Sequence, residues 1–535
     1  MNNFKKNKNL LEEIHKRRTF AIISHPDSGK TTITEKILFI GKVIHNTGSI
    51  KPKKNKKYTK SDWMHIEKKR GISITTSVMR FIYKNKLINL LDTPGHSDFS
   101  EDTYRILTAV DCCLMIIDAS KGVEEQTRKL LSVARMYKKP IITFINKIDR
   151  DFKNPIKLLE EIESEFNIIS SPITWPIGTG SFLQGIYNLK SEEINFYSSF
   201  FNNRSDLKKI TGLFHPHLKN FFDYNTILNI RREVHFLKKN FFIFNKKEFL
   251  QGNLTPVFFG TALKNFGIDQ VLQALVEWAP NPLYRRTNIR KIYPQESKFS
   301  GFIFKIQANM DLKHRDRIAF MRIVSGKYFK GIKIKQTRTL KNLIIRDAFY
   351  FLAGERYFIQ EAYPGDIIGI HNHGNIQIGD TFTEGEKIKF LGIPYFSPEI
   401  FRKIRLKNPL QQKKLLKGLF QLSEEGSVQI FRSIQNNSLI IGVIGILQFE
   451  IISDRLRMEY NIEPIYENIN ICCIRWISSK YVDKLNFFKQ QNESYLGLDK
   501  DNLLIYFFPS MINLKIITAR NKDIIFSKTR EYQIM

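Results

Sequence analysis

Short apolar runs alternate with amphipathic stretches through roughly the first half of this chain of 535 residues. An apolar run without polar interruptions is typical of a strand that is buried on both faces of a parallel sheet. The runs that predict such strands are Thr19–Ser24, Leu87–Leu91, Pro140–Ile145 and Pro256–Phe259. The stretch Gln126–Met136 instead places Leu130, Leu131 and Ala134 on one face at the helical period. The pattern therefore predicts an α/β domain over residues 1–282.

Three further regions depart from this alternation. Residues 153–251 exceed what the sheet needs, and we expect them to form a subdomain inserted in the α/β domain. Across 297–392, short β-runs are separated by glycine turns without long helices, which predicts a β-barrel. Across 394–535, the helical stretches Gln411–Glu425 and Gly445–Tyr460 alternate with strand-like runs. That last pattern predicts an α+β domain.

The first predicted strand ends in a segment whose residue types suit a phosphate-binding loop, or P-loop. Its residues are Ser24, His25, Pro26, Asp27, Ser28, Gly29, Lys30 and Thr31, and a predicted helix follows. In this strand, turn and helix order, backbone N–H groups of the loop and of the helix N-terminus face the phosphates. We expect Lys30 to reach the β- and γ-phosphates and the Thr31 hydroxyl to bind Mg²⁺.

A second segment follows the strand that ends at Leu91. Its residues are Asp92, Thr93, Pro94, Gly95 and His96. At a strand end the Asp92 carboxylate can hold a Mg²⁺-bound water, and Gly95 lets its backbone N–H approach the γ-phosphate because no Cβ intervenes. We predict that His96 is the catalytic residue and orients the attacking water. The alternative for such a histidine is a solvated loop residue.

A third segment follows the strand that ends at Ile145, and its residues are Asn146, Lys147, Ile148 and Asp149. The Asp149 carboxylate can accept hydrogen bonds from N1 and N2 of guanine, and adenine lacks that pair of donors. Asn146 would brace the loop, and the Lys147 stem would cover one face of the base. After a further strand, Thr261 and Ala262 can present a backbone N–H to guanine O6. Three such motifs in this order predict a GTPase that binds GTP and GDP.

These residues resemble a known family. The segments Arg70–Ile72, Asp92–His96 and Asn146–Asp149 are similar to motifs of the translational GTPases, the group of elongation factors G and Tu. Within that group, further segments resemble the bacterial class II peptide chain release factors. Those segments are Ser24–Thr32, Lys60–Met64, Gly71–Ser77, Ser100–Arg105, Ile173–Gly178, Gly301–Met310 and Tyr363–Asp366. The resemblance extends over residues 17–530 and is weakest over residues 190–251.

The resemblance implies a ribosome-dependent GTPase of translation termination, which stimulates class I release factors and promotes their dissociation from the ribosome. It implies that Thr31 and Ser73 bind Mg²⁺ directly and that Asp92 binds it through water. His96 would position the attacking water once the ribosome holds it in place, with Pro26 and Ile72 as an apolar gate beside it. The implied partners are the ribosome, including its RNA, and class I release factors, and we expect the chain to be a monomer.

Two other functions stay open from the sequence. An elongation factor G-like translocase would share the three motifs, but such a protein needs further domains beyond the third. A GTP-binding RNA scaffold with little hydrolysis would also keep the nucleotide loops. The complete element from Asp92 to His96 argues against the scaffold, because a scaffold has no need of a residue that orients water.

The charge of the chain favours a polyanionic partner. Lys and Arg number 84 against 52 Asp and Glu, which gives a formal net charge of +32. Ribosomal RNA is a partner that suits such a charge. The chain is also rich in Lys, Asn, Ile and Phe, as an A+T-rich genome would make it, so the charge by itself does not establish RNA contact.

Four cysteines lie in two adjacent pairs, Cys112-Cys113 and Cys472-Cys473. Neighbours on a strand point to opposite faces, so neither pair suits a disulfide, and the spacing is not that of a zinc site. We expect four reduced cysteines in the core, as in a cytoplasmic protein. No apolar run approaches the length that crosses a membrane, so we expect no membrane partner.

Overall fold

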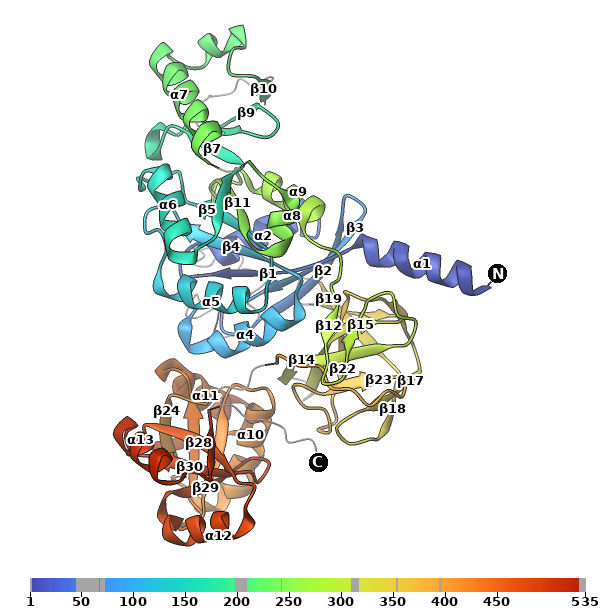
Figure 1. Ribbon diagram of the computed structural model, residues 1–535, viewed down its shortest axis with the longest axis vertical. Coiled ribbons are helices and arrows are strands. Elements are labelled where there is room, and N and C mark those ends of the chain that lie inside the picture. The colour runs from blue at the N-terminus through green and yellow to red at the C-terminus, as the bar shows by residue number, and fades with distance from the viewer. Residues whose placement is uncertain are drawn as a thin grey trace.

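The computed structural model describes residues 2–44, 67, 73–197, 209–241, 243–308, 317–352, 355–393 and 397–528. Figure 1 shows an α/β body that carries the N-terminus, a β-barrel beside it, and an α+β body that lies below both. This order is the fold class that the sequence predicts. Some residues that carry the resemblance lie outside the described residues, namely Lys60–Met64, Arg70–Ile72, Asn309 and Met310.

A seven-stranded sheet forms the centre of the α/β body. Its strands, in their order across the sheet, are β2 (Ser77–Tyr83), β3 (Lys86–Asp92), β1 (Arg17–Ser24), β4 (Cys112–Asp118), β5 (Ile141–Asn146), β11 (Leu254–Phe259) and β6 (Ile169–Pro172). Neighbouring strands are parallel, except that β2 pairs antiparallel with β3. β1, β4, β5 and β11 are buried along their whole length, as their apolar runs require. The four predicted strands correspond to β1, β3, β5 and β11 and are confirmed, although the first two residues of β3 are only partly buried.

Helices cover both faces of this sheet (Figure 1). The helices of this body are α1 (Asn2–Lys16), α2 (Lys30–Ile40), the 3-10 helix η1 (Ser97–Phe99), α4 (Ser100–Ala109), α5 (Glu125–Met136), α6 (Pro155–Phe166), α8 (Lys246–Gln251) and α9 (Ile268–Trp278). One core cluster joins the sheet to α4, α5 and α6, and a second joins it to α2, α8 and α9. Leu130, Leu131 and Ala134 of α5 are buried in the first cluster, as their helical spacing predicts.

A small antiparallel sheet with one long helix lies between β6 and β11 in the chain, and Figure 1 shows it at the end of the molecule remote from the α+β body. Its elements are β7 (Thr174–Ile177), η2 (Gly180–Phe182), β8 (Gly185–Asn188), β9 (Glu193–Phe196), β10 (Lys209–Thr211), η3 (Pro216–Asn220) and α7 (Tyr224–Asn240). Ile177, Leu218 and Ile230 belong to a separate buried cluster here. This region therefore has a core of its own. It covers residues 174–240 and is smaller than the predicted insertion of 153–251, because α6, β6 and α8 pack in the α/β body.

The β-barrel follows a two-stranded ribbon of β12 (Arg285–Arg286) and β13 (Lys291–Ile292). Its eight antiparallel strands, in their order around the barrel, are β18 (Asn342–Ile345), β17 (Ile332–Gln336), β23 (Thr381–Thr383), β14 (Ser300–Ala308), β15 (Arg317–Ser325), β22 (Ile367–His371), β19 (Ala348–Leu352) and β20 (Glu355–Ile359). A short pair, β16 (Tyr328–Phe329) and β21 (Glu361–Ala362), lies beside them. Ile303, Met321 and Phe382 fill the interior.

The α+β body is an eight-stranded antiparallel sheet with four α-helices among the described residues. The strands are, in order, β27 (Pro464–Asn468), β24 (Ile400–Leu406), β26 (Leu439–Val443), β25 (Gln429–Ser433), β29 (Leu496–Asp499), β30 (Leu504–Phe508), β28 (Cys473–Ser478) and β31 (Ile525–Ser527). The helices are η4 (Pro409–Gln411), α10 (Gln412–Glu424), α11 (Ile446–Tyr460), α12 (Val482–Gln491), η5 (Glu493–Tyr495) and α13 (Met511–Arg520). The two predicted helices correspond to α10 and α11.

Buried ion pairs join the barrel to the α/β body. Arg17 at the start of β1 bonds through Nε to Asp366 Oδ2 at 2.8 Å, and both side chains are buried. Arg322 of β15 pairs through Nη2 with Asp111, and its Nη1 donates to the Thr19 hydroxyl at 2.7 Å. Because a buried charge is stable only with such a partner, these contacts fix the two bodies against each other.

All four cysteines are free, and Cys112, Cys113 and Cys473 are buried. Cys472 is exposed, so the prediction of four core cysteines is wrong at this position. Cys472 lies one residue before β28 begins and is therefore outside the alternation of the strand. Within the described part of the chain, every helix is too short or too polar to cross a membrane.

Candidate nucleotide site

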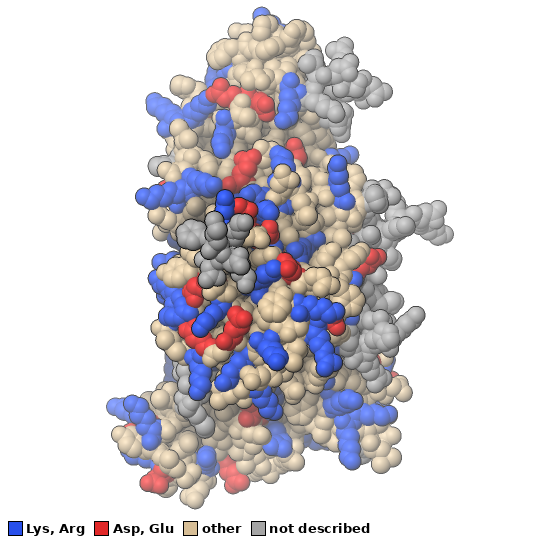
Figure 2. All heavy atoms as spheres, turned by 90° about the vertical axis from the view of Figure 1, so that its right-hand side faces the viewer, with Lys and Arg blue, Asp and Glu red and all other residues tan. Residues whose placement is uncertain are grey.

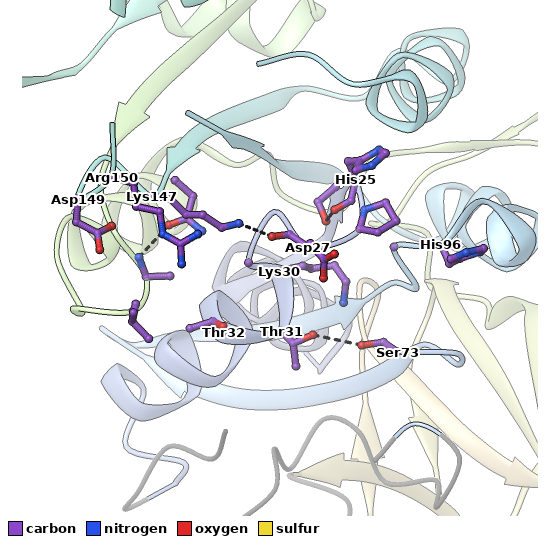
Figure 3. Close-up of a pocket in the computed structure, with 17 residues that line it drawn as sticks. His25, Asp27, Lys30, Thr31, Thr32, Ser73, His96, Lys147, Asp149 and Arg150 are labelled. Carbon is purple, nitrogen blue, oxygen red and sulfur yellow. Dashed lines mark hydrogen bonds between the residues drawn. The ribbon is translucent and has the colours of Figure 1, made fainter. Parts of the chain in front are cut away.

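The parallel sheet brings the three predicted segments to one edge. β1, β3 and β5 run in the same direction, so the loops at their carboxyl ends lie together. One cavity forms at this edge (Figure 3). The predicted residues that line it are Ser24, His25, Pro26, Asp27, Gly29, Lys30, Thr31, Ser73, Gly95, His96, Asn146, Lys147, Asp149 and Ala262. In Figure 3 Asp149 lies at one end of the cavity and His96 at the other, with Lys30 and Thr31 between them.

Six further predicted residues are buried and do not line the cavity: Ser28, Asp92, Thr93, Pro94, Ile148 and Thr261. They support its loops instead. The Thr93 hydroxyl donates to the Ile22 carbonyl at 2.7 Å, which fastens the second segment to β1. The Ile148 amide donates to the Gly260 carbonyl at 3.4 Å, which joins the third segment to the loop after β11.

Asn146 connects three loops around the cavity. Its Nδ2 donates to the Ser28 carbonyl at 2.8 Å, and its Oδ1 accepts from the Ala262 amide at 2.9 Å. Gly29 lies against this side chain with φ of +97°, and a Cβ at that position would collide with Asn146 Nδ2. A glycine is therefore required here both for its backbone conformation and for the close approach of Asn146.

The phosphate end of the cavity carries a buried ion pair. Lys30 Nζ lies 2.5 Å from Asp92 Oδ1, and the two side chains are 6% and 2% exposed. The Thr31 and Ser73 hydroxyls lie 3.3 Å apart, although they come from residues 42 positions apart in the chain. Two hydroxyls and a nearby carboxylate are hard oxygen donors, and the set fits Mg²⁺, which takes few protein ligands and completes its shell with phosphate and water. Among the described residues no group of three or more His, Cys, Asp or Glu is placed to hold a metal ion.

Lys147 spans the base end of the cavity. Its Nζ donates to the Asp27 carbonyl at 2.5 Å and to Asp118 Oδ2 at 2.7 Å. Burial by itself would raise the pKa of Asp118, but the hydrogen bonds from Lys147 and Ser120 outweigh it and hold this pKa below its usual range. The Lys147 stem is thereby held across the cavity next to Asp149, as a wall for a flat base would be.

His96 lies at the opposite end, with its side chain 36% exposed. Its Nδ1 is 3.2 Å from the Asp98 amide and 3.2 Å from Asp98 Oδ1. The hydrogen bond with the Asp98 carboxylate raises the pKa of His96 above its usual value. In Figure 3 the ring points away from Lys30 and Thr31, toward the helix that follows.

Three residues that line the cavity were not predicted as site residues: Thr32, Arg150 and Leu263. Each directly follows a predicted motif, so extension of each motif by one residue would have found them. Asp118, which fixes Lys147, ends β4 and could have been noticed as a carboxylate at a strand end. Asp98 carried no such signal, because its partner lies in a distant part of the chain.

Comparisons with known proteins agree along the whole chain. Residues 15–281 match the elongation factor Tu GTP binding domain, and residues 298–385 match elongation factor G domain 2. A crystal structure of ttk003000868 from Thermus thermophilus aligns over 87% of this chain and 69% of that one, with a TM-score of 0.70 and 20% identity, which shows a shared fold. The fold and the cavity thus define a translational GTPase, an enzyme that hydrolyses GTP.

Residues 390–518 match the class II release factor RF3, C-terminal domain. Peptide chain release factor 3 of Buchnera aphidicola subsp. Acyrthosiphon pisum (strain 5A) is 60% identical over 523 residues, which cover 98% of this chain and 99% of that protein. The protein of the same name from Buchnera aphidicola subsp. Schizaphis graminum (strain Sg) is 58% identical over 520 residues, which cover 97% and 98%. The chain belongs to the peptide chain release factor 3 family, and it is a GTPase of translation termination.

Proposed function

We propose that this chain is a ribosome-dependent GTPase that stimulates class I release factors and promotes their dissociation from the ribosome. The observation that carries the proposal is the cavity that has Asp149 at one end, Lys30 and Thr31 in the middle and His96 at the other end. These are the groups that a guanine base, a chain of phosphates and an attacking water each need. Membership of the release factor 3 family supports termination as the process.

Each side chain would act on a defined part of GTP. Asp149 would accept the N1 and N2 hydrogen bonds of guanine, with the Lys147 stem against the base. Lys30 would exchange its bond with Asp92 for the β- and γ-phosphates, since a phosphate group is the stronger partner for an ammonium. The released Asp92 carboxylate could then accept from water bound to Mg²⁺, while Thr31 and Ser73 bind the ion through their hydroxyls. Mg²⁺ would supply charge neutralisation between the phosphates.

His96 would orient the water that attacks the γ-phosphate. Its ring points away from the phosphate end, so it must turn before it can do so. Intrinsic hydrolysis should accordingly be slow, and the ribosome would raise the rate by stabilising the turned ring. Translocation is a weaker proposal, because the match over residues 390–518 is to a release factor domain.

The surface is suited to a polyanionic partner. Figure 2 shows Lys and Arg side chains along the whole length of one face, with fewer Asp and Glu between them. With a net charge of +32, this face would contribute electrostatic attraction to ribosomal RNA. We further propose that the protein acts as a cytoplasmic monomer whose three domains have the limits that the sequence indicates.

The test of this proposal combines two assays on the purified protein. The first measures GTP hydrolysis with and without ribosomes, and the second measures how fast a class I release factor leaves termination complexes. Stimulated hydrolysis together with faster departure is expected. Stimulated hydrolysis without faster departure would contradict the proposed promotion of release factor dissociation. No stimulation would contradict ribosome dependence altogether.

The catalytic assignment has its own test. We expect His96→Ala to keep GTP affinity, because the base and phosphate contacts remain, and to lose ribosome-stimulated hydrolysis by roughly 100-fold or more. His25→Ala is the matched control, since His25 is a second histidine that lines the cavity and its Nε2 lies 3.2 Å from Glu124 Oε1. Normal stimulated hydrolysis by His96→Ala would remove the catalytic role of His96.

A further inference from the structure

Asp98 links the His96 loop to the α+β body. One carboxylate oxygen, Oδ1, lies 3.2 Å from Nδ1 of the His96 ring. The other, Oδ2, accepts a hydrogen bond of 2.8 Å from the Leu447 amide in the first turn of α11. Amides in the first helical turn have no partner within the helix, and the helix dipole favours a negative charge there. The Asp98 carboxylate thus lies against the predicted catalytic side chain, which it bonds when the ring is protonated, and it accepts a hydrogen bond from a helix of another domain.

Gly445, just before α11, makes room for this carboxylate. A Cβ at Gly445 would overlap the Asp98 carboxyl group. The φ of Gly445 is −135°, which any residue adopts, so the glycine is needed for space and not for its backbone conformation. The Gly445 amide donates to Gln448 Oε1 at 3.1 Å, and this bond holds the turn in place. The approach of Asp98 to α11 therefore depends on the absence of one methyl group.

An apolar cluster lies beside the Asp98 bridge. Ile74, Phe99 and Ile451 are buried together, and Leu447 packs against them. The cluster joins the segment that follows Ser73, the 3-10 helix η1 and α11. Both the polar bridge and the apolar cluster hold the α+β body against the His96 loop.

The carboxylate is ionised in this position. Burial by itself would raise the pKa of Asp98, but hydrogen bonds with the His96 ring and the Leu447 amide outweigh it and hold the pKa below its usual range. Hydrogen bonds that involve a charged group are stronger than neutral ones. The contact with Leu447 is therefore one that must be broken before α11 can leave.

We propose that Asp98 is a positioning residue that couples the orientation of His96 to the docking of α11. While α11 holds Asp98, the His96 ring stays on the Asp98 side and points away from Lys30 (Figure 3). Withdrawal of α11 frees Asp98, and the ring can then turn toward the attacking water. The inference rests on the proposed role of His96 and adds the surface that controls it, the N-terminus of α11.

The main test is Gly445→Ala, which displaces the Asp98 carboxylate without a change in charge. If the ribosome must separate α11 from Asp98, the variant reaches the active state at a lower ribosome concentration, because this separation has already occurred. We expect its KM for ribosomes in GTP hydrolysis to fall roughly tenfold while kcat stays the same. Ile446→Ala is the matched control, because Ile446 is the next residue and is 59% exposed. An unchanged KM in Gly445→Ala, or an equal fall in Ile446→Ala, overturns the proposal.

A second variant breaks the bridge from the other side. Asp98→Ala should also lower the KM for ribosomes, and its combination with Gly445→Ala should lower it no further, because both changes remove one contact. Additive effects would show two separate contacts and would overturn the proposal. The His96→Ala assay keeps the two proposals apart. If His96→Ala is inactive while Gly445→Ala keeps the original KM, only the coupling is wrong.

Discussion

Asp149 shows how much of the specificity can reside in one side chain. It lines the cavity next to the Lys147 stem, and its carboxylate has two oxygens for the two donors of guanine. An asparagine of the same shape offers one oxygen and one NH₂ group, and the NH₂ group would face a guanine donor. If Asp149 binds guanine as proposed, the choice between GTP and ATP depends on the charge and not on the shape of this residue.

We expect Asp149→Asn to weaken GTP binding at least roughly tenfold, since hydrogen bonds to a charged group are lost, and to leave the weak binding of ATP unchanged. Displacement of a fluorescent guanine nucleotide by GTP and by ATP measures both affinities. Asp151→Asn is the control, because Asp151 lies two residues further on and is exposed. If Asp149→Asn and the unchanged protein had the same ratio of GTP to ATP affinity, Asp149 would not be the residue that recognises guanine.

At the scale of elements, the pattern of apolar positions predicts α10 and the face that it buries. Leu415, Leu419 and Leu422 repeat at the helical period, and all three belong to the core of the α+β body. Phe420 is the larger side chain, yet it lies one position out of this repeat and is 44% exposed. Position on the helix therefore decides burial, and residue type alone does not.

This difference gives a prediction about stability. Leu419→Ala should lower the free energy of unfolding of the α+β body by about 2–5 kcal/mol, because it leaves a cavity in the core. Phe420→Ala should lower it by less than about 1 kcal/mol despite the larger deletion. Urea titrations followed by tryptophan fluorescence would measure both, in a background where Trp63, Trp175 and Trp278 are replaced by Phe so that Trp476 alone reports. A larger loss in Phe420→Ala would show that α10 packs on its other face.

At the scale of the whole molecule, buried charges lie where the α/β body meets the barrel. Lys139 is 5% exposed and donates to the Val110 carbonyl at 2.5 Å. Burial lowers the pKa of Lys139 from 10.5 to about 7, and the nearby Arg285 adds to the effect while Asp111 opposes it. Asp111 also pairs with Arg322 of the barrel, so Lys139 belongs to the joint between the two bodies.

The lowered pKa predicts how stability depends on pH. Between pH 7 and 10.5 the unfolded chain binds a proton at Lys139 that the folded chain does not, so stability rises with pH in this window. We expect the stability of the unchanged protein relative to Lys139→Met to increase by about 2 kcal/mol from pH 7 to 9. Lys138→Met is the control, because Lys138 is the neighbouring lysine and is exposed. Parallel pH profiles for the unchanged protein and Lys139→Met, from urea unfolding, would contradict the prediction.

Much of the site follows from local sequence. The three loops lie at the ends of strands whose apolar runs are visible in the sequence, and a parallel sheet brings such ends to one edge. Fourteen of the predicted residues accordingly line one cavity. Thr32, Arg150 and Leu263 were missed because a sequence motif covers only the residues with a recognisable pattern. The wall of the cavity also includes the residue that follows each motif.

The sequence by itself determined the nucleotide loops, the order of the three bodies and the faces of the helices, because each depends on residues near one another in the chain. Only the tertiary structure decided that Lys30 pairs with Asp92, that Cys472 is exposed and that Asp98 caps α11. The Lys30 contact joins residues 62 positions apart, and the contact of Asp98 with Leu447 joins residues 349 positions apart. A local pattern sets which face of an element is apolar. It holds no information about which polar group from a distant part of the chain will contact that element, because such contacts depend on how the three bodies pack.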